Sequence, residues 1–193
     1  RVVTGAVERQ RLLRRARVRL VLNESVRMLW GFELTYLPQP VYAPRVVPHA
    51  TPSPPCVAFA GYWGPSKGLD DLLGAYRALL PRHPGARFVI AGDGTSPEDP
   101  WASEFRRRAR GVSERIELPG FIAAADFDGF LRGLTALVLP YRTEIPGAAS
   151  AMLMRAQQAG VPLIVSDTAF LRSQVDPENV TIVPPRDARA LAE

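Results

Sequence analysis

The chain has 193 residues and a net charge of +5, but residues 1–20 hold seven arginines against one acid, and the other seventeen bases face eighteen acids. A charge confined to one end excludes a broad cationic face, so nucleic acid is not an expected partner. One cysteine, Cys56, and two histidines beside prolines, His49 and His83, exclude a disulfide framework and a thiolate zinc cluster and predict no metal site.

The first 37 residues predict too few elements to close a domain. The pattern indicates a basic helix over about 6–16, a strand over 18–22, a helix from Ser25 and a strand near 34–37. Two short strands do not form an independent sheet. We therefore interpret residues 1–37 as the tail of a missing N-terminal domain.

A proline-rich segment follows, with seven prolines in residues 38–55. Proline at that density blocks helices and interior strands, which predicts a linker. Ahead of it, the arginines of residues 1–20 stand among apolar side chains such as Leu12 and Leu13, a composition that suits contact with a membrane surface. No apolar run approaches the roughly 20 residues of a membrane span. We expect a cytoplasmic protein with peripheral membrane contact through residues 1–20.

From residue 56 to residue 193, apolar runs alternate with helical stretches, of which 69–80 has the 3.6-residue period of an amphipathic helix. The runs are 57–60, 88–91, 116–118, 136–139, 163–165 and 181–183. Apolar strands separated by helices predict a doubly wound α/β domain with a parallel sheet, whose ligands bind at the carboxyl ends of the strands. The last residues resemble the start of a helix, so we expect this domain to be truncated at its C-terminus.

The loop after the first of these strands, residues 61–68, is a candidate phosphate site. Gly61 lets the backbone approach a ligand, Tyr62 follows it, and Lys67, the one lysine of the chain, stands at the start of a helix. A full charge beside a helix N-terminus favours an anion. The alternative is an exposed helix entry without a ligand.

Two glycine turns follow the next strands. Gly92 lies in Ala91-Gly92-Asp93-Gly94, and its alternative interpretation is a plain turn. Gly120 and Phe121 offer an open backbone edge and an aromatic ring that could face a planar base, unless Phe121 belongs to the core.

The loop after the fourth strand combines a carboxylate, Glu144, with the small residues of a helix start, Gly147, Ala148, Ala149 and Ser150. Amides at a helix N-terminus cradle phosphate, and a carboxylate accepts hydrogen bonds from hydroxyls, which together suit a nucleotide-sugar. The alternative is a surface glutamate that caps the helix.

From about Val57 to Glu193 the chain resembles the carboxyl-terminal, donor-binding domain of retaining nucleotide-sugar glycosyltransferases of family four, which have the GT-B fold. The matching segments, in order, are 59–61, 66–68, 89–94, 117–121, 139–141, Glu144, and 155–167. The resemblance implies a sugar transfer in glycan biosynthesis, from a nucleotide-diphosphate donor to a glycan, lipid or small-molecule acceptor, with the missing domain as the acceptor domain. It implies no cofactor, the nucleotide-sugar being a substrate.

The resemblance also implies roles for single residues. Lys67 would hold the donor diphosphate, Glu144 would contact the donor sugar, Gly147 to Ser150 would offer amides to the phosphates, and Gly120 and Phe121 would border the base. Two positions depart from the family pattern: Tyr62 stands where an arginine is usual, and the second motif glutamate falls on Met152, or on Arg155 after realignment.

These departures leave alternatives open. One is a non-catalytic nucleotide-binding or scaffold domain on the same fold. The other is a flavodoxin-like regulatory domain, for which Asp93 is the available phospho-acceptor. We expect the present chain, as mainly a donor-binding half, to bind nucleotide without turnover.

Overall fold

The computed structural model describes residues 10–11, 14–22, 28–29, 31–37, 52–142 and 150–193. In the N-terminal part, residues 10–11 and 14–15 are helical. Strand β1 (Leu20–Val21) pairs in parallel with β4 (Thr35–Tyr36). Two further strands, β2 (Met28–Leu29) and β3 (Phe32–Glu33), pair antiparallel.

The predicted helix from Ser25 is wrong where the structure describes it. Met28 and Leu29 form β2 instead, and residues 25–27 lie outside the described part. Gly31, with φ +80°, lies between β2 and β3 and supplies the left-handed backbone that a tight hairpin connection needs. Cross-strand pairing thus overrides the helical pattern at these positions.

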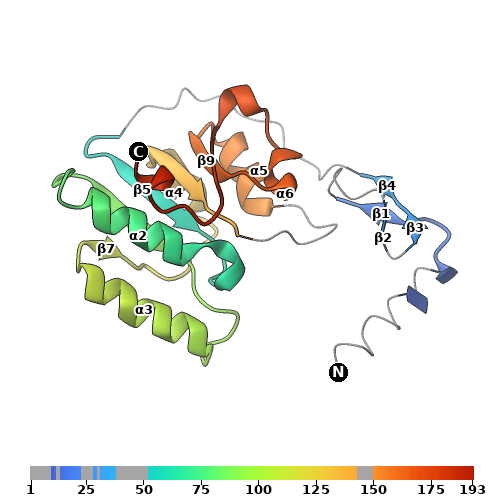
Figure 1. Ribbon diagram of the computed structural model, residues 1–193, viewed down its shortest axis with the longest axis horizontal. Helices are drawn as coiled ribbons and strands as arrows, with labels where there is room; N and C mark the ends of the chain where they lie inside the picture. The colour runs from blue at the N-terminus through green and yellow to red at the C-terminus, as the bar shows by residue number, and fades with distance from the viewer. Residues whose placement is uncertain (1–9, 12–13, 23–27, 30, 38–51, 143–149) are drawn as a thin grey trace.

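The predicted doubly wound sheet is confirmed (Figure 1). Six parallel strands run in the spatial order β10-β9-β8-β5-β6-β7. Their bounds are β5 Cys56–Ala60, β6 Arg87–Ala91, β7 Ile116–Glu117, β8 Ala136–Leu139, β9 Leu163–Ser166 and β10 Thr181–Val183. The chain enters at β5, builds outward to β7, and returns to build from β8 to β10. The strand order therefore reverses between β5 and β8.

Helices cover both faces of this sheet. On one face α2 and α3 lie side by side (Figure 1), and the short η3 packs against α2. The connection from β8 to β9 runs along the sheet in the opposite direction to that from β5 to β6, so the right-handed crossover rule places α5 on the other face. The helices are η1 Pro65–Lys67, α2 Leu69–Leu79, α3 Pro100–Val112, α4 Phe127–Arg132, α5 Ala151–Gln158, α6 Ala169–Arg172, η2 Pro177–Asn179 and η3 Ala190–Ala192.

The core between α2 and the sheet is closed by Tyr76, a polar side chain at its centre. Its ring lies 4.7 Å from that of Phe88, and its hydroxyl donates to the Val57 carbonyl at 3.1 Å and lies 3.4 Å from that of Val89. A buried hydroxyl needs such partners. Burial also raises the pKa of Tyr76, so this residue stays neutral.

Candidate functional site

The reversal of strand order brings the loops after β5 and β8 together. Two backbone contacts set their register. The Arg142 amide donates to the Ser66 carbonyl at 2.8 Å, and the Pro140 carbonyl packs against Gly68. A Cβ on Gly68 would lie 1.7 Å from the Pro140 oxygen, and its φ is +68°, so this close approach requires glycine. Open α/β sheets bind ligands in the crevice at such a switch point.

Lys67 ends η1 at this place. Its Nζ lies 3.9 Å from the centroid of the buried Tyr141 ring, a cation–π contact that holds the ammonium without neutralising it. Among the residues that the structure describes, no carboxylate lies within 4.0 Å of this ammonium. The Tyr141 ring therefore holds the ammonium in place, and no described carboxylate neutralises its charge.

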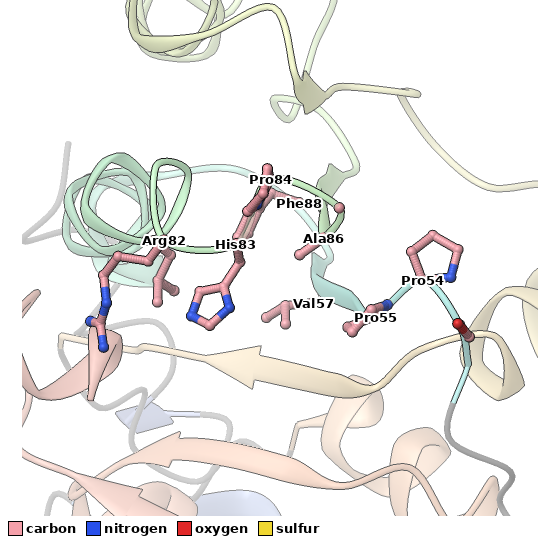
Figure 2. A pocket seen from close by; sticks show the side chains of 11 residues that line it. Pro54, Pro55, Val57, Arg82, His83, Pro84, Ala86 and Phe88 are labelled. Atoms are coloured by element: carbon pink, nitrogen blue, oxygen red, sulfur yellow. The ribbon is translucent and has the colours of Figure 1, made fainter.

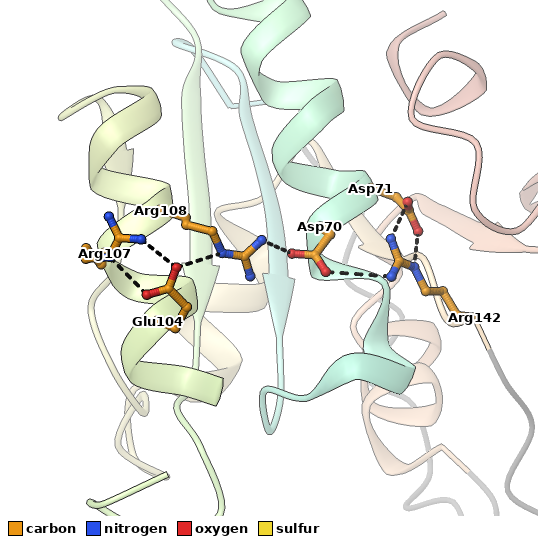
Figure 3. A network of polar contacts seen from close by, with 6 residues as sticks. All are labelled: Asp70, Asp71, Glu104, Arg107, Arg108 and Arg142. Atoms are coloured by element: carbon orange, nitrogen blue, oxygen red, sulfur yellow. Dashed lines mark hydrogen bonds and ion pairs between the residues drawn. The ribbon is translucent and has the colours of Figure 1, made fainter. Parts of the chain in front are cut away.

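Three arginines near the same edge of the sheet are, by contrast, paired with carboxylates. Arg106 pairs with Asp93, and Arg172 with Asp167. Arg142 donates through Nε and Nη2 to both oxygens of Asp71, at 2.6 Å each (Figure 3). Lys67 has no such partner among the described residues, so its charge can be offered to an anion.

Two exposed aromatic rings flank this edge. Tyr62 and Phe121 are 60% and 57% exposed, and their centroids lie 5.2 Å apart in an edge-to-face arrangement. Exposure of Phe121 excludes the alternative that placed it in the core. A backbone hydrogen bond holds the loop of Phe121 in place, since the Gly92 amide donates to the Gly120 carbonyl at 2.7 Å.

The turn at Gly92 is tightly packed and differs from a plain surface turn. Its φ is +115°, and a Cβ would lie 1.9 Å from the Gly61 carbonyl oxygen. Next to it the buried Trp63 donates its backbone amide to the Asp93 carbonyl at 2.7 Å. Gly61 and Gly92 therefore let two loops meet at the carboxyl ends of β5 and β6.

The structure describes only part of the fourth predicted loop, the one after β8. Glu144, Gly147, Ala148 and Ala149 lie outside the described residues. Ser150 is buried and caps α5, because its Oγ accepts from the Leu153 amide at 3.2 Å. Its own amide already donates to Gln174 Oε1 at 2.8 Å, so Ser150 contributes a helix cap rather than a free amide.

The positions expected for a second motif glutamate serve the packing of α5. Arg155 donates to Asp128 at 2.7 Å, and its guanidinium lies 4.2 Å from the centroid of Phe127. Both partners belong to or begin α4, so Arg155 joins α5 to α4. Met152 is partly buried against the core. The sequence of α5 contains no acidic residue.

Two residues that the sequence does not predict, Arg142 and Asp71, are joined by the fold beside the loop of Lys67. They are 71 residues apart, and neither belongs to a recognisable motif. The acidic pair Asp70-Asp71 in the first turn of α2 is no signal for this contact, because the helix dipole alone favours acids there.

A hollow of about 630 Å³ lies at the opposite edge, near the amino ends of β5 and β6 (Figure 2). Its wall is mainly apolar, from residues such as Pro54, Val57 and Phe88, with His83 and Arg82 at its side. It brings no set of polar groups together, so it is not the candidate site.

The described part of the chain contains no group of three or more His, Cys, Asp or Glu side chains arranged to hold a metal ion. Its helices are too short or too polar to span a bilayer.

The chain is similar to proteins that handle sugars. A GDP-mannose-dependent monoacylated alpha-(1-6)-phosphatidylinositol monomannoside mannosyltransferase from Corynebacterium glutamicum is 26% identical over 147 residues. The alignment covers 74% of this chain and 37% of that protein, so the chain spans little more than a third of its relative.

Solved structures agree on the fold. The C-terminal domain of a glycosyl transferase group 1 family protein from Francisella tularensis aligns with a TM-score of 0.60 and 21% identity over 73% of each chain. HepE from Anabaena, solved with UDP and glucose, aligns with a TM-score of 0.61 and 18% identity over 71% of this chain and 36% of that one. The sheet is thus that of a Rossmann-like, GT-B-type C-terminal domain. The family model for glycosyl transferases group 1 matches residues 54–193, and this chain belongs to that family.

Proposed function

We propose that residues 56–193 form the donor-binding domain of a retaining, family-four glycosyltransferase, which moves a sugar from a nucleoside diphosphate to an acceptor. The observation that carries this proposal is the state of Lys67. Its ammonium lies at the switch point of the sheet, over the Tyr141 ring, while the neighbouring arginines are paired with carboxylates. A cation that has no carboxylate partner among the described residues suits a diphosphate at this place.

The chemistry follows from where charge develops. When the bond between the sugar and the diphosphate breaks, negative charge gathers on the leaving phosphate. A fixed ammonium stabilises that charge more than the ground state. Lys67 would therefore both bind the donor and assist departure, and Glu144 would contact the sugar.

The base would bind at the other side of the edge. The exposed rings of Tyr62 and Phe121 offer faces for stacking, and Gly120 leaves its backbone open beside them. The mannosyltransferase relative is named as GDP-mannose-dependent and HepE was solved with UDP, so guanine and uracil are both bases to test. We also propose that the acceptor is a glycan, a lipid or a small molecule. Residues 1–20 would contact a membrane surface.

Calorimetry on this chain tests the donor site directly. We expect UDP or GDP to bind and Lys67→Ala to weaken that binding by roughly 10- to 100-fold, the value of one charge-assisted contact. Arg77→Ala removes the same charge from an exposed position in the last turn of α2 and should leave binding unchanged. Equal affinities of wild type and Lys67→Ala would contradict the site.

A non-catalytic nucleotide-binding domain is the second candidate. The similar proteins, which are named as transferases and synthases, do not favour it, and only the composition of α5 points to it. With Arg155 engaged by Asp128 and no acid in α5, a carboxylate that would bind the ribose hydroxyls is missing from this helix. Donor hydrolysis decides between the two. A full-length protein that binds the donor but releases no sugar from it, with or without a cell extract as the source of acceptor, would support the non-catalytic role.

A further inference from the structure

We infer that Arg142 is a positioning residue that holds Lys67 in place, an inference that rests on the proposed function of Lys67. The cation–π contact with Tyr141 is the one described side-chain contact that fixes the ammonium. Tyr141 directly precedes Arg142 in the chain. Whatever holds Arg142 therefore also sets where the Tyr141 ring lies beneath the lysine.

The two segments face each other residue by residue. Ser66 accepts from the Arg142 amide, Lys67 lies over the Tyr141 ring, and Gly68 packs on the Pro140 carbonyl. A shift by one residue would break all three contacts together. The position of the ammonium thus depends on keeping this register.

The guanidinium of Arg142 stabilises this register, because it binds Asp71 of α2. Its two hydrogen bonds to Asp71 form a bidentate pair, the geometry in which arginine and carboxylate bind most specifically. Asp71 is only 9% exposed and lies in the first turn of α2, three residues beyond Gly68. These hydrogen bonds raise the pKa of Arg142 above its ordinary value.

A second carboxylate extends the anchor to α3. Asp70 lies 2.7 Å from Arg108 Nη1 and 3.6 Å from Arg142 Nη1, and Arg108 lies 3.7 Å from Glu104 (Figure 3). The network thus ties the end of β8 to two helices. It also pairs both acids of the first turn of α2, Asp70 and Asp71, with arginines.

The single lysine makes this placement measurable. A chain labelled with [ε-¹³C]lysine has one lysine side-chain signal, from Lys67. At 3.9 Å from the Tyr141 centroid, the ring current should move its CεH₂ protons upfield of those in a free lysine. Tyr141→Leu removes the ring and supplies the reference position.

We expect Arg142→Met, without nucleotide, to move the signal to the Tyr141→Leu position and to weaken UDP or GDP binding about tenfold. Because positioning and not charge is at issue, Arg142→Met/Asp71→Asn should leave the signal displaced as well. The matched control is Arg107→Met, which removes an arginine paired with Glu104 at the far end of the network and should change neither signal nor affinity.

An unchanged Lys67 signal in Arg142→Met would overturn the inference, and so would a wild-type signal in the double variant. If Arg142→Met does not fold, Asp71→Asn weakens the same pair with a smaller change, and its signal must move in the same direction. Failure of the proposed function is seen separately. A wild-type chain that shows the upfield signal but binds neither UDP nor GDP would contradict the donor site and not the positioning of Lys67.

Discussion

At the scale of single residues, two glycines with similar backbones have different surroundings. Gly68 has φ +68° and Gly120 has φ +77°. A Cβ on Gly120 would meet nothing within 4 Å, whereas on Gly68 it would lie 1.7 Å from the Pro140 oxygen. Gly120 is required by conformation alone, and Gly68 by conformation and by the contact between two loops.

Alanine substitutions separate these two requirements. Both should cost about 1 kcal/mol for a left-handed backbone, and Gly68→Ala about 1–3 kcal/mol more, since the Pro140 backbone must move. Gly68→Ala should also weaken nucleotide binding, because that movement displaces Tyr141 from Lys67. Urea unfolding of the two variants measures the difference. Equal losses of stability would show that the loops separate without cost.

Single residues of the candidate site differ in whether the sequence alone predicts them. Lys67 was predicted because a lysine beside glycines at a helix start has a local signature. Arg142 and Asp71 were not, since an ion pair between residues 71 positions apart becomes visible only when β5 and β8 are known to be neighbours. Arg155 falls at the position of the second motif glutamate after realignment and is a departure from the family pattern. Its contacts with Asp128 and Phe127 depend on packing that an alignment does not contain.

At the scale of elements, α3 begins with a strong N-cap. The Asp99 carboxylate accepts from the amides of Trp101 and Ala102, at 3.0 and 3.2 Å, and from the Thr95 amide at 3.2 Å. Pro100 follows at the first helical position, where its missing N–H costs nothing. The hydrogen bonds, that from Ala102 first, lower the pKa of Asp99 below its ordinary value.

This shift predicts how stability depends on pH. The folded-state pKa lies below the unfolded one, so the unfolded chain binds the proton more readily and stability falls as pH drops below about 4, through the folded pKa. Asp99→Asn keeps an acceptor oxygen but does not titrate. Unfolding free energies between about pH 6 and pH 2.5 should therefore fall less steeply in the variant. Parallel curves for the two proteins would contradict the contribution of this cap.

Elements differed in how well they could be predicted. Four of the six sheet strands, β5, β6, β8 and β9, are short, mainly apolar runs that are largely buried, and the sequence pattern predicts them directly. The helix predicted from Ser25 failed because the pattern around Met28 and Leu29 suits either state. The strand forms because of the turn at Gly31 and the pairing with β3, and helical periodicity registers neither of them.

At the scale of the whole molecule, the buried core of the α/β domain consists of residues from Cys56 onward. In the N-terminal part, the backbone hydrogen bonds of Thr35 and Leu37 reach Arg19 and Val21 of the same part. Val18 and Leu20 are 68% and 53% exposed there. This arrangement supports the proposal that residues 1–37 belong to another domain and that residues 38–55 are a linker.

Removal of residues 1–51 tests that division. If the core lies wholly within residues 52–193, the shortened chain should unfold within about 2 °C of the original and bind nucleotide with the same affinity. Its net charge should change from +5 to −1, because the removed segment holds nine bases and three acids. A fall in melting temperature of about 5 °C or more would place part of the stabilising core before residue 52. In that case the first 51 residues would belong to the donor domain, and the linker would have to be sought elsewhere.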